Sequence, residues 1–410
     1  MRRRWYPLII ALAVLASLFI AAYRIPFCDS GGPNIRLEYH ELILGLPSSS
    51  TLDKRGIKTI LYWNGLFKAK DFMLGEGYIA KHCPSDYNNC FATKNRHLLP
   101  IESYDAILLH GNSGELMVDD LPVKRSPHQK YVFVAAESPG NWPFNSSGND
   151  DVWPRFKGYF NATATYQHDS DVIYTYADVI ALKDEKAGEK ADDGVKRLDT
   201  LSIKEILAKK SRKASWYVSH CKTNGHREKY VTELEKYMPV DKFGRCHEWL
   251  VGCPVRDRDC FHDEIEPNYF FYLSFENSLC QDYVTEKFFD ALKYYVVPVV
   301  YGGADYAKIA PPKSYIDALD FDSPKDLASY LINLSRNLTK YEEYFEWKEH
   351  YKIIDPQKRV ICELCKLVNN NEKKTYTVSE WYNSSRCPLQ HRMSRQVYPD
   401  FAVKRTKSIP

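Results

Sequence analysis

Short apolar runs bounded by polar turns recur through the first half of the chain, over residues 57–63, 106–109 and 131–136. Runs of this length are typical of strands that are buried on both faces of a parallel sheet. The stretches between them are long enough for crossover helices. The pattern therefore predicts an α/β layer structure.

The clearest periodic pattern lies in the second half of the chain. An aromatic-rich run over residues 269–275 predicts a strand, residues 285–294 predict a helix that Thr285 can cap, and residues 296–301 predict a second strand. Together they predict a βαβ unit. Pro298 lacks the N–H donor that a central strand needs, so we expect a bulge or irregular pairing there.

A charged stretch without aromatic residues, over residues 184–213, separates the two halves, and a partly helical pattern near residues 201–207 closes it. After it, residues 215–219 predict a strand, and a polar turn leads to a helix that begins near Arg227. We therefore expect two α/β domains with a cleft between them and ligands at the carboxyl ends of the strands. The expected parts are a first domain, a second domain and a cysteine-containing tail, over residues 56–205, 206–355 and 356–410.

The N-terminus is expected to meet a membrane, because three arginines at positions 2–4 precede an apolar stretch over residues 8–23. The stretch is short for a membrane span, so a cleaved signal peptide is one interpretation. Trp5 and Tyr6, as interfacial aromatics, lengthen it to the ~20 residues that a thin bilayer needs, and the arginines favour a cytosolic N-terminus. We therefore expect a type II anchor, with a cytosolic tail, a transmembrane segment and a stem over residues 1–7, 8–23 and 24–55.

The composition narrows the class of protein. With 410 residues, 44% of them hydrophobic, the chain is long enough for two cores of ordinary size. Its 56 basic and 53 acidic side chains are mixed along the sequence and give a net charge of +3. No strongly basic face is expected, and nucleic acid is therefore not expected as a partner.

Two features indicate that the chain beyond the anchor lies in an oxidising, lumenal compartment. Eleven cysteines include the close pairs Cys83/Cys90 and Cys362/Cys365, which such a compartment would turn into disulfides. The same four thiols would suit a zinc site in a cytosolic protein, which is the alternative. N-glycosylation sequons begin at five asparagines: Asn145, Asn161, Asn333, Asn337 and Asn383.

A carboxylate stands at the end of a predicted strand in the first domain. Glu137 follows the apolar run over residues 131–136 and precedes Ser138 and Pro139. A carboxylate in this position can act as the general base that takes a proton from an attacking hydroxyl. A solvated glutamate without a catalytic role is the alternative.

Cationic side chains stand at two predicted helix starts. A helix N-terminus together with Lys287 suits a phosphate, and Glu286 beside it can accept hydrogen bonds from ribose hydroxyls. Arg227 repeats this arrangement and is a second phosphate candidate, which would stabilise a departing nucleoside diphosphate. The alternatives are an ordinary solvated first turn and a surface arginine. The sequence contains neither a Walker motif nor a G-x-G-x-x-G fingerprint, which argues against a nucleoside triphosphatase or a dinucleotide dehydrogenase.

Three segments, in this order, resemble the α1,3-fucosyltransferases of glycosyltransferase family 10. They are FYLSFENS over residues 271–278, DYVTEK over residues 282–287 and VPVV over residues 297–300. Further segments resemble the family over residues 136–139, 165–171 and 345–348, and the likeness runs from about residue 57 to residue 366.

The resemblance implies a GT-B fold of two Rossmann-like domains, the first binding the acceptor and the second binding GDP-fucose. It implies an inverting transfer of L-fucose from GDP-fucose to O3 of N-acetylglucosamine (GlcNAc) in a glycoprotein glycan, by a single-pass type II protein of the Golgi membrane with a lumenal catalytic domain. No required cofactor and no metal site are expected, and stimulation by a divalent ion such as Mn²⁺ is compatible with that.

The resemblance also assigns roles to residues. By similarity, Glu137 is the base, Arg227 and Lys287 hold the diphosphate, and Glu286 and Tyr283 bind the ribose. The remaining donor-binding candidates are Asn277, near the phosphate or the fucose, with Glu276, Tyr166 and Ser219. Cys83 and Cys90 pair with Cys362 and Cys365, in an order left open, which ties the tail back to the first domain.

The cysteines bear on the acceptor. The region holds more cysteines than the Lewis-antigen members of the family carry there: Cys221, Cys246, Cys253 and Cys260. The position of Cys221 after Ser219 resembles that in enzymes that fucosylate the innermost GlcNAc of N-glycans. We therefore expect that core GlcNAc as the acceptor. Antenna GlcNAc, giving Lewis-type structures, is the alternative. A catalytically inactive glycan-binding relative is a further alternative, although it would have no reason to keep the base, both cations and the ribose-binding pair.

Overall fold

A computed structural model describes residues 56–67, 69–111, 121–141, 156–182, 202–246, 260–372 and 374–388. The expected cytosolic tail, transmembrane segment and stem lie outside these residues, as do Asn145 and Cys253. Within the described part of the chain, no helix combines the length and the apolar character needed to cross a bilayer.

The first half of the described chain forms a seven-stranded sheet in which all neighbours are parallel except the antiparallel pair β2 and β3. The predicted apolar runs are its central strands. They are buried, apart from Lys58 at the start of β1, because both faces of the sheet are covered, as the absence of polar alternation indicated. In spatial order the strands are β2 (Gly77–Tyr78), β3 (Cys90–Thr93), β1 (Lys58–Tyr62), β4 (Ala106–His110), β5 (Lys130–Ala135), β7 (Ala162–Thr165) and β8 (Val172–Ile173).

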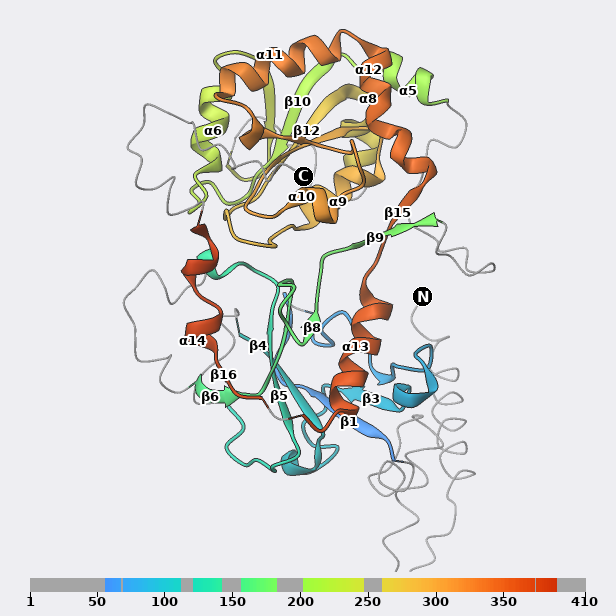
Figure 1. The fold of residues 1–410 in the computed structure, drawn as a ribbon, viewed down its shortest axis with the longest axis vertical. Helices are drawn as coiled ribbons and strands as arrows, with labels where there is room; N and C mark the ends of the chain where they lie inside the picture. Colours follow the sequence, from blue (N-terminus) through green and yellow to red (C-terminus); the bar gives the residue numbers. More distant parts are fainter. Residues whose placement is uncertain are drawn as a thin grey trace, which may run out of the picture. The chain divides into compact units, whose positions relative to one another are not determined.

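The second half forms a five-stranded sheet that is parallel throughout. In spatial order its strands are β11 (Val240–Phe243), β10 (Arg212–Tyr217), β12 (Tyr269–Phe275), β13 (Val297–Tyr301) and β14 (Ile316–Asp317). Side chains alternate across β12, so that Phe271 and Leu273 join a core with helices α6 and α11, while Tyr272 joins a core with helix α9. The sheet therefore carries helices on both faces, which Figure 1 shows.

The predicted βαβ unit is confirmed as β12, α9 (Glu286–Lys293) and β13. The expected irregularity at Pro298 is wrong, because Pro298 pairs in regular register with Tyr272 of β12. On its other side β14 pairs only with Val299 and Val300, so no partner strand faces Pro298 there and no carbonyl lacks a donor on its account.

The helices of the second half begin with α5 (Ile203–Lys209), which Ser202 and Glu205 start with a capping box at the end of the charged stretch. The others are α6 (Arg227–Leu234), the π-helix η6 (Phe261–Ile265), α8 (Glu266–Asn268), α9, α10 (Tyr306–Ile309), η7 (Ala318–Asp320), α11 (Pro324–Ser335), α12 (Leu338–Glu342) and η8 (Glu343–Glu349). Short 3₁₀ turns in the first half are η1 (Ser85–Tyr87), η2 (Ile101–Ser103) and η4 (Pro139–Asn141).

The C-terminal segment returns to the first sheet. Helix α13 (Gln357–Asn369) buries Val360, Ile361 and Leu364 in the core of that sheet and lies beside β1 and β3 in Figure 1. Two antiparallel pairs join distant parts of the chain: β9 (Asp178–Ala181) with β15 (Tyr351–Ile354), and β6 (Lys157–Phe160) with β16 (Tyr376–Thr377). Short helices α14 (Val378–Trp381) and η9 (Ser384–Arg386) follow β16.

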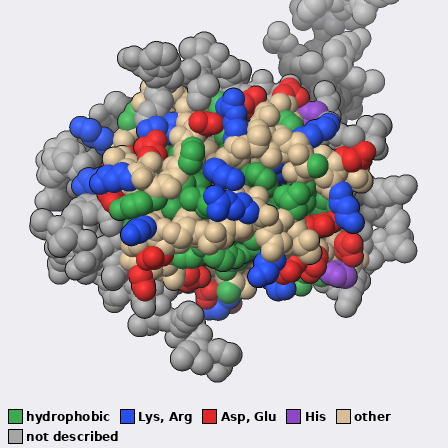
Figure 2. Space-filling view, turned by 90° about the horizontal axis from the view of Figure 1, so that it is seen from above, with side chains coloured by type: hydrophobic (Ala, Val, Ile, Leu, Met, Phe, Trp, Pro, Cys, Tyr) green, Lys and Arg blue, Asp and Glu red, His purple; other side chains and the backbone are tan. Residues whose placement is uncertain are grey.

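Charge is distributed as the composition predicts. In the face drawn in Figure 2, basic and acidic side chains are scattered among one another and do not form a field of one sign. This distribution agrees with the near balance of 56 basic and 53 acidic residues.

Candidate active site

Glu137, the second residue after β5, contacts the loop that follows β12. Tyr283 donates a hydrogen bond from its hydroxyl to Oε2 of Glu137 at 2.8 Å, and the Asn277 side-chain amide donates to the same oxygen at 3.4 Å. Both strands end at this edge of their parallel sheets, which is where α/β folds collect their polar side chains. The structure therefore brings three of the candidate residues together.

Burial keeps Tyr283 in its donor form. Its side chain is fully buried, and burial, followed by the negative charge of Glu137, raises the pKa of Tyr283 well above the ordinary value. The hydroxyl therefore keeps its proton and fixes one carboxylate oxygen of Glu137. Among the described residues, no donor reaches the other oxygen, Oε1.

Glu276 organises the start of α9. Its carboxylate is fully buried and accepts hydrogen bonds from the backbone N–H of Thr285 at 2.8 Å and from the Thr285 hydroxyl at 3.0 Å. Thr285 is the N-cap residue, as predicted, but its hydroxyl bonds to Glu276 and does not cap the helix. Gly303 is required beside this loop, because a Cβ there would lie 2.4 Å from the backbone of Leu279.

Lys287 is held inside this corner. Its ammonium group lies 2.8 Å from the Thr285 hydroxyl, 3.0 Å from Glu286 and 3.4 Å from Glu276. Burial alone lowers the pKa of Lys287, but the two carboxylates outweigh burial and raise it, so the side chain stays charged. Glu286 itself is exposed, as in an ordinary first turn, whereas only 18% of the Lys287 side chain is exposed.

Arg227 is the first residue of α6, where the sequence placed a helix start. The interpretation as a surface arginine is wrong, because Arg227 is only 3% exposed. One guanidinium nitrogen donates to the carbonyl of Phe275 at 2.6 Å and another lies 3.5 Å from the carbonyl of His220. Burial lowers the pKa of Arg227 from a very high ordinary value, so the group remains cationic beside the residue that precedes Glu276.

Several buried polar atoms at the strand ends have no hydrogen-bond partner in the described chain. They are the hydroxyls of Ser138, Ser219 and Ser278, Oδ1 of Asn277 and Nε of Arg227. Unsatisfied buried groups are uncommon in native proteins, and a bound molecule is one way to satisfy them. Their position after β5, β10 and β12 indicates a polar ligand at this edge, and Ser219 is among the predicted donor-binding residues.

Tyr166 packs behind these groups. Its ring is 1% exposed and lies 5.0 Å from the ring of Tyr283. It also lines a cavity of about 320 Å³ together with Asp282, Val284 and Arg359. Of the predicted site residues in the described chain, Tyr166 alone lines this cavity, so the cavity adjoins the cluster around Glu137 without containing it.

The sequence did not identify the C-terminal contribution to the site. The Tyr382 hydroxyl donates to the backbone carbonyl of Glu137. A disulfide joins Cys280, in the loop between Asn277 and Tyr283, to Cys387. Trp381 and Cys387 in the tail were the visible signals, but nothing in the sequence paired Cys387 with Cys280.

The same tail is fixed beside the loop by polar contacts. The backbone N–H of Gln281 donates to the carbonyl of Arg386 at 2.7 Å, and Arg386 forms two hydrogen bonds with the carboxylate of Asp169, at 2.7 and 3.0 Å. Asp169 lies in the 165–171 segment next to Tyr166. The tail thus contacts both the loop that contains Tyr283 and the segment that contains Tyr166.

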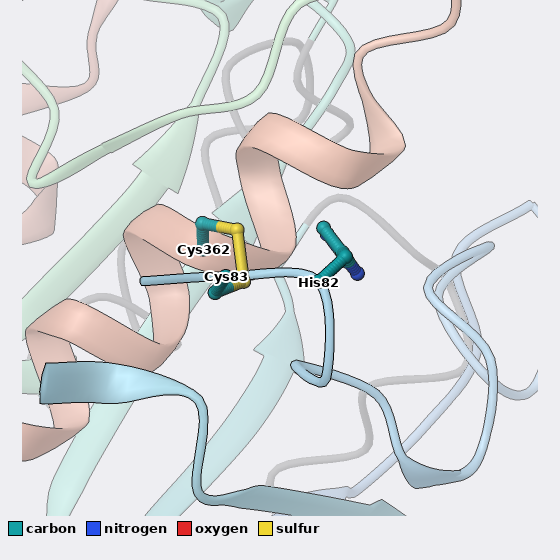
Figure 3. A group of neighbouring side chains, drawn as sticks. All are labelled: His82, Cys83 and Cys362. Carbon is teal, nitrogen blue, oxygen red and sulfur yellow. A yellow bond between two sulfur atoms is a disulfide. The ribbon is translucent and has the colours of Figure 1, made fainter. Parts of the chain in front are cut away.

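The disulfide pairing is confirmed, and the structure supplies its order: Cys83 with Cys362 and Cys90 with Cys365. Figure 3 shows His82 beside the first of these bonds, the one group in the described chain with a spacing suited to a metal ion. The zinc interpretation is wrong, since all four sulfurs are bonded to one another in pairs and are not thiolate ligands. Cys221 pairs with Cys246, and Cys260 is also disulfide-bonded.

Similarity to known proteins covers both sheets. Residues 55–177 match the family described as "Fucosyltransferase, N-terminal", and residues 207–383 match "Glycosyltransferase family 10 (fucosyltransferase) C-term". The chain is 34% identical to alpha-(1,3)-fucosyltransferase C of Drosophila melanogaster over 82% of this chain and 80% of that protein. It is 31% identical to glycoprotein 3-alpha-L-fucosyltransferase A of the same organism, over 80% of this chain and 60% of that protein.

A crystal structure of an α1,3-fucosyltransferase has a similar fold. It superimposes with a TM-score of 0.50 at 20% identity, covering 77% of this chain and 91% of the other. The mixed α/β architecture of the two sheets is therefore one that an α1,3-fucosyltransferase also adopts.

Proposed function

The chain belongs to glycosyltransferase family 10 and is an α1,3-fucosyltransferase, and from this membership we propose how its residues transfer L-fucose from GDP-fucose to O3 of GlcNAc. The proposed arrangement is that of a GT-B enzyme, with the acceptor on the first sheet and the donor on the second. The observation that carries it is the contact of Glu137, at the end of a first-sheet strand, with the loop that starts the Lys287 helix of the second sheet.

In the proposed reaction, the free oxygen of the Glu137 carboxylate takes the proton from O3 of GlcNAc. O3 then attacks C1 of fucose from the face opposite GDP, so the C1–O bond to the phosphate breaks as the new bond forms and the configuration inverts. Tyr283 supports this role by holding Oε2, which leaves Oε1 directed to the acceptor. The reaction is a single displacement without a covalent intermediate.

The leaving group is GDP, whose diphosphate gains negative charge as the bond breaks. We propose that Lys287 and Arg227 stabilise that charge, with Asn277, Ser219 and Glu286 completing the donor site. Lys287 is suited to this because it stays charged and lies at the start of α9, where helix N–H groups add positive potential. The unsatisfied hydroxyl of Ser219 and the Nε of Arg227 are compatible with a donor that bonds to them.

Two fixed cations supply the charge that a metal ion supplies in other nucleotide-sugar enzymes, so we propose that no bound metal is required. Dialysis against EDTA followed by assay in metal-free buffer should leave at least half of the turnover. Loss of nearly all activity, restored by Mn²⁺, would contradict this proposal.

We propose the innermost GlcNAc of N-glycans as the acceptor. The support is the Cys221–Cys246 disulfide close to Ser219, which belongs to the cysteine pattern that the resemblance associates with this acceptor. The observed disulfides also fit the proposed location, a lumenal catalytic part in the Golgi.

The test uses the full chain, purified in detergent from a secretory host, with GDP-fucose and N-glycans of defined branching. Mass spectrometry of the products locates the fucose. Fucose on the innermost GlcNAc supports the proposed acceptor. Fucose on antenna GlcNAc would show that the proposed acceptor is wrong, although the enzyme class would be unchanged. Glycan binding without any transfer or GDP release would identify an inactive glycan-binding relative.

A further inference from the structure

A second cavity, of about 600 Å³, lies away from the residues proposed for catalysis. It is formed by α11, the start of α12 and η8, and its walls include Tyr330, Tyr344, Asn333 and Asn337. None of its lining residues belongs to the predicted donor or acceptor sites. It therefore requires its own explanation.

The walls have the chemistry of a sugar-binding surface. Tyr330 is 39% exposed, and its hydroxyl lies 2.7 Å from that of Tyr344, so the two tyrosines meet at their hydroxyls and form an aromatic wall of the cavity. Lys340 and Glu343 add charged hydrogen-bonding groups. Aromatic faces that meet the C–H faces of a pyranose, with a few polar groups for its hydroxyls, suit a hexose better than a fully apolar ligand.

Two attachment points for such a sugar lie in the cavity wall itself. Asn333 and Asn337 each begin an N-glycosylation sequon and both are exposed. Asn337 is the N-cap of α12, and its Oδ1 accepts a hydrogen bond from the backbone N–H of Lys340 at 3.1 Å. An N-linked glycan attaches to Nδ2 and leaves Oδ1 in place, so the cap survives glycosylation and fixes the direction of the attached sugar.

In the other described sequons, at Asn161 and Asn383, the side-chain nitrogen that would carry the sugar already donates hydrogen bonds. Asn161 donates from Nδ2 to the carbonyl of Gln129 at 2.8 Å and accepts from the buried Tyr131 N–H at 2.7 Å. Asn383 donates from Nδ2 to the carbonyls of Ser379 and Glu380. A sugar on either nitrogen would break backbone contacts that the fold uses.

We propose that Asn337 carries an N-linked glycan whose first GlcNAc lies in this cavity against Tyr330 and Tyr344. The protein would then be both a glycan-modifying enzyme and a glycoprotein with a built seat for its own glycan. The seat stabilises the α11–α12 corner by covering the exposed tyrosine wall. The inference requires only exposure to the glycosylation machinery and does not depend on the role of Glu137.

The first test is site occupancy in the full chain secreted or anchored in animal cells. Release of glycans by peptide N-glycosidase in heavy-oxygen water marks each occupied asparagine in the peptide mass spectrum. We expect the mark on Asn337 and none on Asn161 or Asn383. An unmodified Asn337 would overturn the proposal.

The second test asks whether the first GlcNAc is seated. An endoglycosidase leaves that one sugar on the protein, whereas the N-glycosidase removes it and converts Asn337 to aspartate, which is an equally good cap. We expect the one-sugar form to keep the melting temperature of the intact glycoprotein and the stripped form to lose about 2 °C. Equal melting temperatures of the two forms would show that the sugar is not seated.

Two variants separate the sugar from other causes. Thr339→Ala destroys the sequon at an exposed position while keeping Asn337 and its cap. It should lower the melting temperature as much as removal of the whole glycan does. Tyr330→Ala should abolish the difference between the one-sugar and stripped forms, since the wall is gone. Persistence of the full difference in Tyr330→Ala would overturn the assignment to this cavity. Asn333→Gln, the control on the same wall, should leave the difference unchanged.

Discussion

The two sides of the proposed active site are built in different ways. In the corner from Glu276 to Lys287, the bonds join residues no more than eleven positions apart, all within one βαβ unit. Glu137 instead takes its partners from 140, 146 and 245 positions away, at Asn277, Tyr283 and Tyr382.

The difference separates two properties. Local bonds form with the βαβ unit itself, so we expect the corner to decide donor binding and the stability of the second sheet. The position of Glu137 depends on three distant segments that must pack together, so we expect turnover to be sensitive to residues that contact neither substrate. Four measurements test whether the two sides differ in this way.

The largest effect is expected for Glu137→Gln. The amide keeps the shape of the side chain but cannot take a proton, so turnover should fall by roughly 10² to 10⁴. Affinity for GDP, measured by calorimetry, should stay within twofold of the wild type because the corner is untouched. Near-normal turnover would assign the base to another residue, and Glu349→Gln, at an exposed position, is the control.

Lys287→Ala should reverse that pattern. It removes the cation at the start of α9, so the dissociation constant for GDP should rise by about tenfold or more. It also leaves the buried Glu276 without its cation, which should lower the free energy of unfolding by roughly 3 kcal/mol.

The double variant Glu276→Gln, Lys287→Ala sharpens this prediction. Adding Glu276→Gln to Lys287→Ala removes the unpaired carboxylate charge. It should therefore restore much of the free energy of unfolding but none of the GDP affinity. Recovery of both would mean that Lys287 acts on the donor only through the fold.

Tyr283→Phe probes the long-range contact. Loss of the hydrogen bond to Oε2 should lower turnover about tenfold with little change in GDP affinity, because one bond to a charged group contributes about 1.5 kcal/mol. Tyr382→Phe removes a hydrogen bond to the backbone carbonyl of Glu137 and none to its carboxylate, so its effect on turnover should be smaller. Tyr237→Phe, at an exposed position, controls for the loss of a hydroxyl. If Tyr283→Phe weakened GDP binding and left turnover intact, the ribose role that the resemblance assigned to Tyr283 would take precedence.

The smallest effect concerns a second buried lysine, which contrasts with Lys287. Burial lowers the pKa of Lys210 to about 7, and its ammonium group bonds only to backbone carbonyls, including that of Tyr269 at 2.9 Å. Between pH 7 and about 10 the unfolded chain holds this proton and the folded protein does not. Stability should therefore rise with pH in that window, by at most about 1.4 kcal/mol per pH unit.

Denaturant unfolding at several pH values measures this slope, and Lys210→Met should remove it. An unchanged slope in that variant would assign the pH dependence to other groups. Lys287 should add no slope between pH 7 and about 10, since a raised pKa leaves it charged in both states there.

Sequence patterns identified much of the second sheet. The strand over residues 269–275 and the helix starts at residues 227 and 286 follow from local runs of apolar and polar residues. The prediction failed at Pro298, because the tolerance of a proline depends on which partner strand lies beside it. It also left Arg227 open as a surface residue, because burial is a property of what packs around a residue.

The first sheet and its tail show the limit more clearly. The position of Glu137 at a strand end was legible, but its contacts with Tyr283 and Tyr382 were not. The resemblance supplied the set of cysteines that pair across the chain without their order, and the bond between Cys280 and Cys387 had no sequence signal.

Sequence patterns were sufficient for the central strands and the βαβ unit, for the positions of the carboxylate and the cations at their ends, and for the family. The folded structure was needed to establish which distant residues hold Glu137, which cysteines are joined and which sequon asparagines have a free amide nitrogen. The physical reason is that local structure is set by neighbouring residues at low entropic cost. Contacts across more than a hundred residues form only when the whole core has packed around them.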